Sequence, residues 1–129
     1  MAWLGERGVE GEELHEVLAA LAEEGAIDDE RFARRYAEDK RELRGWGPDR
    51  IAEALHARGV ERSLIEAALA GEDEGETVAR ALALLEGGGA YAGGEAGRAR
   101  ALGLLARRGY PVDTAYEAVR ALERRSDAA

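Results

Sequence analysis

Apolar residues recur every three or four positions along most of the chain, which is the spacing of one face of an α-helix. Glycine and proline interrupt this pattern and mark where one helix ends and the next begins. The pattern predicts helices over residues 11–24 and 28–43, from residue 48 to Gly59, around 64–69, and over 74–86, 95–108 and 113–125, with fraying from Ser126 onward.

The predicted helix over residues 28–43 carries clear signals at its start. Gly25 can adopt the left-handed conformation that closes the helix before it. Asp28 is a favourable N-cap because its carboxylate can accept hydrogen bonds from the free amides of the first turn, and Asp29 suits the positive end of the helix dipole. The positions expected on the buried face of this helix are Phe32, Ala33, Tyr36 and Leu43.

A corner rich in glycine separates this helix from the next one. Gly45 and Gly47 flank Trp46 and break the helix, and Pro48 fits the first position of the following helix, where its missing amide hydrogen is not needed. The inward positions and the closing glycine of that following helix are Ile51, Leu55 and Gly59.

An internal repeat organises the predicted helices. Its copies are Leu4-x-x-Arg7-Gly8-Val9, Leu55-x-x-Arg58-Gly59-Val60 and Leu105-x-x-Arg108-Gly109-Tyr110, and their glycines lie 51 and 50 residues apart. The period predicts an all-α fold of tandem three-helix repeats in an elongated or curved array. We expect an incomplete first repeat over residues 1–27, a second over 28–71, and a third over 72–129 that contains a glycine-rich loop at 86–94.

Composition supports a helical protein. Alanine and leucine supply 42 of the 129 residues, whereas valine, isoleucine and threonine together supply 11, so an all-β fold is excluded. No apolar run approaches the roughly 20 residues that span a bilayer, and no signal peptide is evident. The chain has no cysteine. We expect a cytoplasmic monomer without a membrane interaction.

Charge is unevenly distributed along the chain, whose net charge is -9. Residues 1–30 and 64–97 are acidic, whereas residues 31–63 and 98–129 each carry a net charge of +3. One interpretation is pairing within helices, as between Glu30 and Arg34. The other is a basic stripe that meets an acidic partner or a nucleoprotein. Free DNA is a poorer target because an acidic body repels phosphates.

Sequence evidence for catalysis is weak. His15, His56 and Ser63 have no neighbours that would make them a catalytic or metal site, and the carboxylate clusters do not match a calcium loop. Gly87-x-Gly89-x-x-Ala92 resembles a dinucleotide fingerprint, but a helix precedes it where that fingerprint needs a strand. We therefore predict a protein without enzymatic activity, metal or cofactor.

Two motifs in the middle of the chain resemble the RecX family, whose members regulate the RecA recombinase. They are Leu21-x-x-x-Gly25-x-Ile27-Asp28-Asp29-Glu30-Arg31-Phe32-Ala33 and Arg44-Gly45-Trp46-Gly47-Pro48-x-x-Ile51-x-x-x-Leu55-x-x-x-Gly59-Val60. The third copy of the repeat, at Leu105, also resembles the family. The resemblance covers nearly the whole chain and is clearest over residues 21–69.

This resemblance implies a helical repeat protein that binds RecA, notably along the groove of the RecA–DNA filament, and suppresses its recombinase, ATPase and coprotease activities. Arginine suits such a surface because its planar group can bind a carboxylate or phosphate through two hydrogen bonds. The candidate partner-binding residues are Arg31, Arg34, Arg35, Arg41, Arg44 and Arg50, with Arg98, Arg107 and Arg108 from the third repeat. The alternatives are a helical DNA-binding module that acts without RecA and an enzyme that uses the glycine loop.

Overall fold

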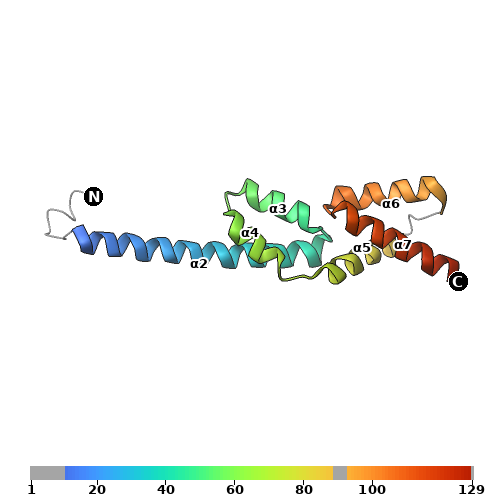
Figure 1. Ribbon diagram of the computed structural model, residues 1–129. Coiled ribbons are helices and arrows are strands. Elements are labelled where there is room, and N and C mark those ends of the chain that lie inside the picture. Colours follow the sequence, from blue (N-terminus) through green and yellow to red (C-terminus); the bar gives the residue numbers. More distant parts are fainter. Residues whose placement is uncertain (1–10, 89–92, 129) are drawn as a thin grey trace.

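The structure of the protein is a computed structural model that describes residues 11–88 and 93–128. All regular secondary structure in these residues is helical, as predicted. The helices are α2 (Gly11–Arg44), α3 (Pro48–Ala57), α4 (Arg62–Leu69), α5 (Glu74–Gly88), α6 (Gly94–Arg108) and α7 (Val112–Ala128). They form an elongated body from which the N-terminal half of α2 projects (Figure 1). None of these helices is long and apolar enough to cross a lipid bilayer.

The two helices predicted over residues 11–24 and 28–43 are one continuous helix, α2. Gly25 does not end a helix, and Asp28 and Asp29 lie in the helix interior instead of at a cap. A Cβ atom at Gly25 would meet nothing within 4 Å, so a side chain would fit at this position of the helix. Val17, Leu18 and Leu21, which form the apolar stripe of this segment, are all exposed.

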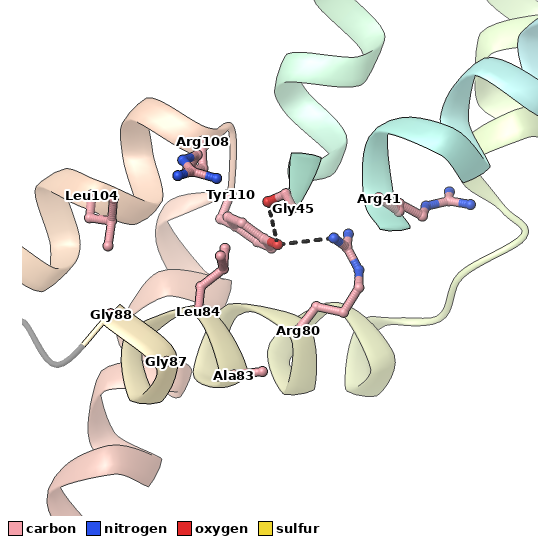
Figure 2. Close-up of a pocket in the computed structure, with 10 residues that line it drawn as sticks. All are labelled: Arg41, Gly45, Arg80, Ala83, Leu84, Gly87, Gly88, Leu104, Arg108 and Tyr110. Carbon is pink, nitrogen blue, oxygen red and sulfur yellow. Dashed lines mark hydrogen bonds between the residues drawn. The ribbon is translucent and has the colours of Figure 1, made fainter. Parts of the chain in front are cut away.

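The remaining chain forms two three-helix bundles. The first bundle consists of the C-terminal half of α2 with α3 and α4, and the second consists of α5, α6 and α7. The bundles meet where Gly45, just after α2, lies beside Tyr110, just before α7 (Figure 2). The buried apolar residues of the first bundle are Ala33, Ala37, Ile51, Leu55, Val60, Ile65 and Ala68.

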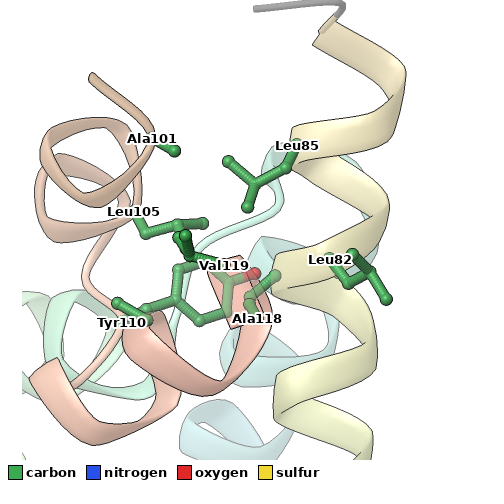
Figure 3. Close-up of a cluster of buried hydrophobic side chains, with 9 residues drawn as sticks. Leu82, Leu85, Ala101, Leu105, Tyr110, Ala118 and Val119 are labelled. Atoms are coloured by element: carbon green, nitrogen blue, oxygen red, sulfur yellow. The ribbon is translucent and has the colours of Figure 1, made fainter. Parts of the chain in front are cut away.

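The second bundle has the larger apolar core. Leu105 and Val119 are fully buried and converge on Tyr110 between the helices (Figure 3). The buried members of this core are Ala81, Leu82, Leu85, Ala101, Leu105, Tyr110, Ala115, Ala118 and Val119. Burial of each leucine or valine side chain in this core contributes about 1.5 to 3 kcal/mol, so these contacts stabilise the bundle.

Two apolar positions expected in the core of the first bundle lie at its surface. Phe32 is 45% exposed and Leu43 is 77% exposed. The reason is the rotation of α2, which turns the small side chains of Ala33 and Ala37 toward α3 and α4 and leaves larger neighbours at the side. Tyr36 is half-buried and packs against the edge of the core.

Two helix ends also differ from the prediction. α5 continues through Gly88, so the predicted loop over residues 86–94 is shorter at its start, and its residues 89–92 lie outside the described residues. Helix α7 continues past Ser126 to Ala128, where fraying was expected.

Replacement of Gly25 by alanine tests the continuous helix. Alanine is favoured over glycine inside a helix by about 0.5 to 1 kcal/mol, so Gly25→Ala should stabilise residues 13–30 by that amount. Hydrogen exchange of the amides in this segment measures the change. If Gly25 were a left-handed helix end, the same substitution would destabilise the segment by about 1 kcal/mol.

Candidate functional site

The two bundles are joined by direct backbone contact between two glycine corners. The Gly47 amide donates to the Arg108 carbonyl at 2.7 Å, and the Asp49 amide donates to the Gly109 carbonyl at 2.9 Å. A Cβ atom at Gly47 would lie 2.5 Å from the Gly109 oxygen. Gly109 has φ +91°, and a Cβ atom there would collide with the backbone of Arg50. Both glycines are therefore required by the close approach of the chains.

The side chain of Arg80, in α5, forms hydrogen bonds to several groups at this junction. One of its nitrogens, Nη1, donates to the carbonyl of Trp46 and to the hydroxyl of Tyr110, each at 3.0 Å. The Tyr110 hydroxyl in turn donates to the Gly45 carbonyl at 3.0 Å, as Figure 2 shows. The remaining nitrogens of Arg80 hold the Glu72 carboxylate at 2.5 and 2.9 Å. One arginine therefore links both bundles and the segment between them.

The charges at this junction perturb one another. Burial alone would raise the pKa of Glu72, but hydrogen bonds from Arg80 and Thr77 and the charges of Arg80 and Arg41 hold that pKa below its ordinary value. Burial alone would lower the pKa of Arg80. The hydrogen bond to Glu72 outweighs burial, so the pKa of Arg80 lies above its ordinary value. Burial raises the pKa of the Tyr110 hydroxyl above its ordinary value.

Arg41 is a structural residue, although the sequence predicted a partner-binding role. Its Nη2 donates to the carbonyls of Ala68 and Leu69, at the end of α4, at 3.1 and 3.2 Å. Its side chain is 10% exposed and lies 3.9 Å from Glu72. It is turned inward because α4 ends beside it, a packing relation that the sequence does not reveal.

Two further candidate arginines take part in the junction. Arg108 donates to the carbonyl of Arg44, the last residue of α2, at 2.8 Å. Arg50 donates to the carbonyl of Arg107 at 3.2 Å. Arg44 and Arg107 are exposed, and their carbonyls accept these bonds. Arg44, Arg50, Arg107 and Arg108 therefore lie together, and they belong to the contact between the two bundles.

A partly exposed set of rings and cations runs along the side of the first bundle. Phe32 and Tyr36 have ring centroids 5.7 Å apart, and Tyr36 and Trp46 have centroids 6.4 Å apart. Lys40 lies 5.2 Å from the Tyr36 ring and 4.8 Å from the Trp46 ring. Arg58 lies over Tyr36 at 4.8 Å, and Arg50 over Trp46 at 4.2 Å. We call this set the cation–aromatic ladder: Phe32, Tyr36, Lys40, Trp46, Arg50 and Arg58.

Of the cation–aromatic ladder, sequence analysis predicted a binding role for Arg50 alone. It placed Phe32 and Tyr36 in the core and gave Lys40, Trp46 and Arg58 no binding role. Two signals could have found them. Phe32, Tyr36 and Lys40 are four residues apart and share one side of a helix. Arg58 belongs to the repeated Leu-x-x-Arg-Gly motif. The closeness of Trp46 to Tyr36 depends on the folded corner and has no local signal.

The other candidate arginines lie elsewhere. Arg31, Arg34 and Arg35 are exposed on the outer side of α2, where they line a shallow hollow with Phe32 and Glu38. Arg34 is paired with Glu30 at 2.8 Å, as the sequence indicated. Arg98 is in the second bundle and bonds Glu123 at 2.6 Å. The nine predicted arginines thus do not form one surface.

The cation–aromatic ladder is suited to recognition. Ring faces contribute apolar contact area, and the cations beside them can attract acidic groups of a partner. Within the described part of the chain, no group of three or more histidine, aspartate or glutamate side chains is arranged to hold a metal ion.

Comparisons with known proteins give a consistent picture. A family model described as the second three-helix domain of RecX matches residues 28–69. A regulatory protein RecX of Mycolicibacterium vanbaalenii is 35% identical, with 93% of this chain and 70% of the relative covered. The regulatory protein RecX of Mycobacterium avium is 36% identical, with 90% of this chain and 69% of the relative covered. That of Halorhodospira halophila is 46% identical over 51% of this chain and 40% of the relative.

The fold has a counterpart among solved structures. The crystal structure of RecX from Lactobacillus salivarius superposes with a TM-score of 0.71 and covers 93% of this chain and 80% of that chain. The two sequences are 18% identical over this match, so the similarity concerns the fold alone.

The glycine contact between the bundles can be tested by one added methyl group. Gly47→Ala should destabilise the protein by about 1 to 3 kcal/mol, because the clash is with backbone that cannot rotate away. Gly87→Ala is the matched control, since a Cβ atom there meets nothing within 4 Å. Urea unfolding measures both. Equal stability of the two variants would contradict the required contact.

The lowered pKa of Glu72 predicts a pH dependence of stability. The ionised carboxylate stabilises the folded state above the ordinary pKa of 4.5, and this contribution disappears as the pH falls through the lower folded-state value. Glu72→Gln should therefore lower the free energy of unfolding by about 3 kcal/mol at pH 7, because it leaves Arg80 without its charge partner. The difference from the unmodified protein should shrink below pH 4.5 in urea unfolding. A difference that stays constant down to strongly acidic pH would contradict the ion pair.

Proposed function

The chain belongs to the RecX family, as its motifs indicated, and on this basis we propose that it is a negative modulator of the RecA recombinase. It binds RecA or the RecA–DNA filament and suppresses the recombinase, ATPase and coprotease activities. It acts by binding, without catalysis of its own. The relatives' names, which describe regulatory proteins, support this role.

The exposed surface of the first bundle supports a binding function. Arg31 and Arg35 are exposed, and neither of them takes part in the junction that holds the bundles together. They adjoin Phe32, which begins the cation–aromatic ladder. This basic surface lies within the part of the chain that the RecX family model matches. We infer that it is the contact surface for RecA or its filament.

The charge distribution favours a nucleoprotein over free DNA. With a net charge of -9, the whole protein is repelled by phosphates at long range. A filament offers both acidic protein groups and partly covered phosphates. A local basic surface can bind these groups although the net negative charge of the whole protein is repelled by phosphates. Binding should weaken as salt rises, because exposed charges are screened.

The proposal is tested by the ATPase activity of RecA assembled on single-stranded DNA. Near-equimolar protein should lower this activity, with no nucleotide hydrolysis by the protein alone. No change across a wide titration at low salt, with RecA of the same organism, would contradict the proposed function. A gel shift with duplex DNA alone would instead favour the helical DNA-binding module.

A matched pair of variants locates the surface. Arg31→Glu with Arg35→Glu should raise the concentration needed for inhibition about tenfold, which corresponds to about 1.4 kcal/mol of affinity. Arg120→Glu with Arg124→Glu makes the same change of charge at exposed positions of α7 and should have little effect. Thermal unfolding should show that both variants fold. Equal loss of inhibition in the two would indicate a general charge effect and not a specific surface.

A further inference from the structure

A hollow of about 560 Å³ lies where the two bundles meet (Figure 2). Its wall includes Gly45 of the first bundle, Ala83 and Leu84 of α5, and Leu104 and Arg108 of α6. We call this hollow the junction pocket. No residue of the cation–aromatic ladder lines it. The junction pocket is therefore a second candidate for binding, separate from the surface of the first bundle.

One wall of the junction pocket is apolar. Leu84 and Leu104 are partly buried and pack against the core of the second bundle. Ala83 and Gly87 also line the pocket and are exposed, so it is open to solvent. An apolar side chain that packs against the two leucines removes apolar surface from water, which is favourable. The volume is large enough for such a side chain together with its neighbours.

The charged side chains that line the junction pocket are all arginines. Arg80 and Arg41 share the carboxylate of Glu72. Arg108 donates to the carbonyl of Arg44 at 2.8 Å, and among the described residues no carboxylate forms an ion pair with it. A guanidinium has several N–H groups, so Arg108 can bind a further acceptor. The pocket therefore favours a ligand with an acidic group.

The apolar wall and the cation lie close together. A Cβ atom at Gly45 would be 3.1 Å from Cδ2 of Leu84 and 3.6 Å from Nη1 of Arg108. Both side chains therefore lie beside the same point of the backbone. A ligand group that touches Leu84 is within reach of Arg108. This arrangement fits a ligand in which an apolar group and a carboxylate are neighbours.

We propose that the junction pocket binds an acidic segment of the partner protein. One apolar side chain of that segment packs against Leu84 and Leu104, and a neighbouring aspartate or glutamate accepts hydrogen bonds from Arg108. This inference rests on the proposed function, so the partner is RecA in its filament. It adds a second point of contact, on the second bundle, to the basic surface of the first.

A nucleic-acid strand fits the junction pocket less well. Its phosphates follow one another at short intervals and bind extended sets of cations. Here Arg80 and Arg41 are already engaged with Glu72, and the leucines offer nothing to a phosphate. An acidic protein segment carries apolar side chains and carboxylates on adjacent residues, so it can use both walls of the pocket.

Short peptides test the chemistry of the junction pocket with the protein alone. Acetyl-Glu-Leu-Glu-amide should shift the NMR amide signals of Leu84, Gly87 and Leu104 in a saturable way. Acetyl-Glu-Ala-Glu-amide should bind at least about fivefold more weakly, because it lacks the side chain that packs against the leucines. Acetyl-Lys-Leu-Lys-amide should not bind, because its cations would approach Arg108. If the first peptide does not bind, or if either control binds as tightly, the proposal is overturned.

A matched pair of variants tests the pocket in binding of fluorescent protein to RecA filaments. Ala83 and Ala79 are exposed positions one turn apart in α5, but only Ala83 is a lining residue. Ala83→Glu places a carboxylate that repels the acidic segment and competes for Arg108, so it should weaken binding at least about tenfold. Ala79→Glu makes the same change of charge and should alter binding less than about twofold. Thermal unfolding should show that both variants fold.

Cross-linking identifies the occupant. The photoreactive residue p-benzoylphenylalanine replaces Ala83, and the protein is irradiated with RecA filaments on single-stranded DNA. Peptide mapping should place the cross-links in a RecA segment where an apolar residue adjoins an aspartate or glutamate. Cross-links to DNA, to a second copy of this chain, or to a RecA segment without acidic residues would overturn the proposal.

The filament measurements separate this inference from the proposed function. If the unmodified protein binds filaments and Ala83→Glu binds as tightly as Ala79→Glu, the inference fails alone. If the unmodified protein does not bind filaments, the proposed function fails, and this inference, which names the same partner, fails with it.

Discussion

The contact between Gly47 and Gly109 is the constraint on which the rest of the structure depends. Two backbone segments meet without intervening side chains, since a Cβ atom on either would collide with the other chain segment. This approach brings the end of α2 to Arg108 and the carbonyl of Trp46 to Arg80. The orientation of one bundle on the other follows from a steric requirement that no other residue type meets.

The charged residues at the junction serve stability because they are paired. Removing Glu72 and Arg80 from water is unfavourable, and the ion pair with its hydrogen bonds to Thr77 and Tyr110 offsets that cost. Arg41 supports the end of α4 in the same way. Basic residues that look alike in the sequence therefore differ in their partners. Arg41 and Arg108 bond backbone carbonyls of distant segments, whereas Arg34 pairs with a glutamate of its own helix.

The proposed contact surface lies on the first bundle, among side chains that take no part in the junction between the bundles. Phe32 lies at the surface because the alanines of α2 form the packed face, and Arg58, at the end of α3, is also exposed. Their rings and cations remain in contact with one another, so the cation–aromatic ladder keeps a defined shape without a partner. A preformed surface loses less conformational entropy on binding than a flexible one does.

The sequence by itself determined the helical class, the glycine corners, the repeated Leu-x-x-Arg-Gly motif and the family, because these depend on local spacing and on the conformational freedom of glycine. It did not determine that α2 continues through Gly25, since glycine is compatible both with a left-handed helix end and with a helix interior. Nor did it show which arginines are structural. Arg41 is held inward by carbonyls of α4 from 27 and 28 residues away, and only the tertiary structure brings such distant groups together.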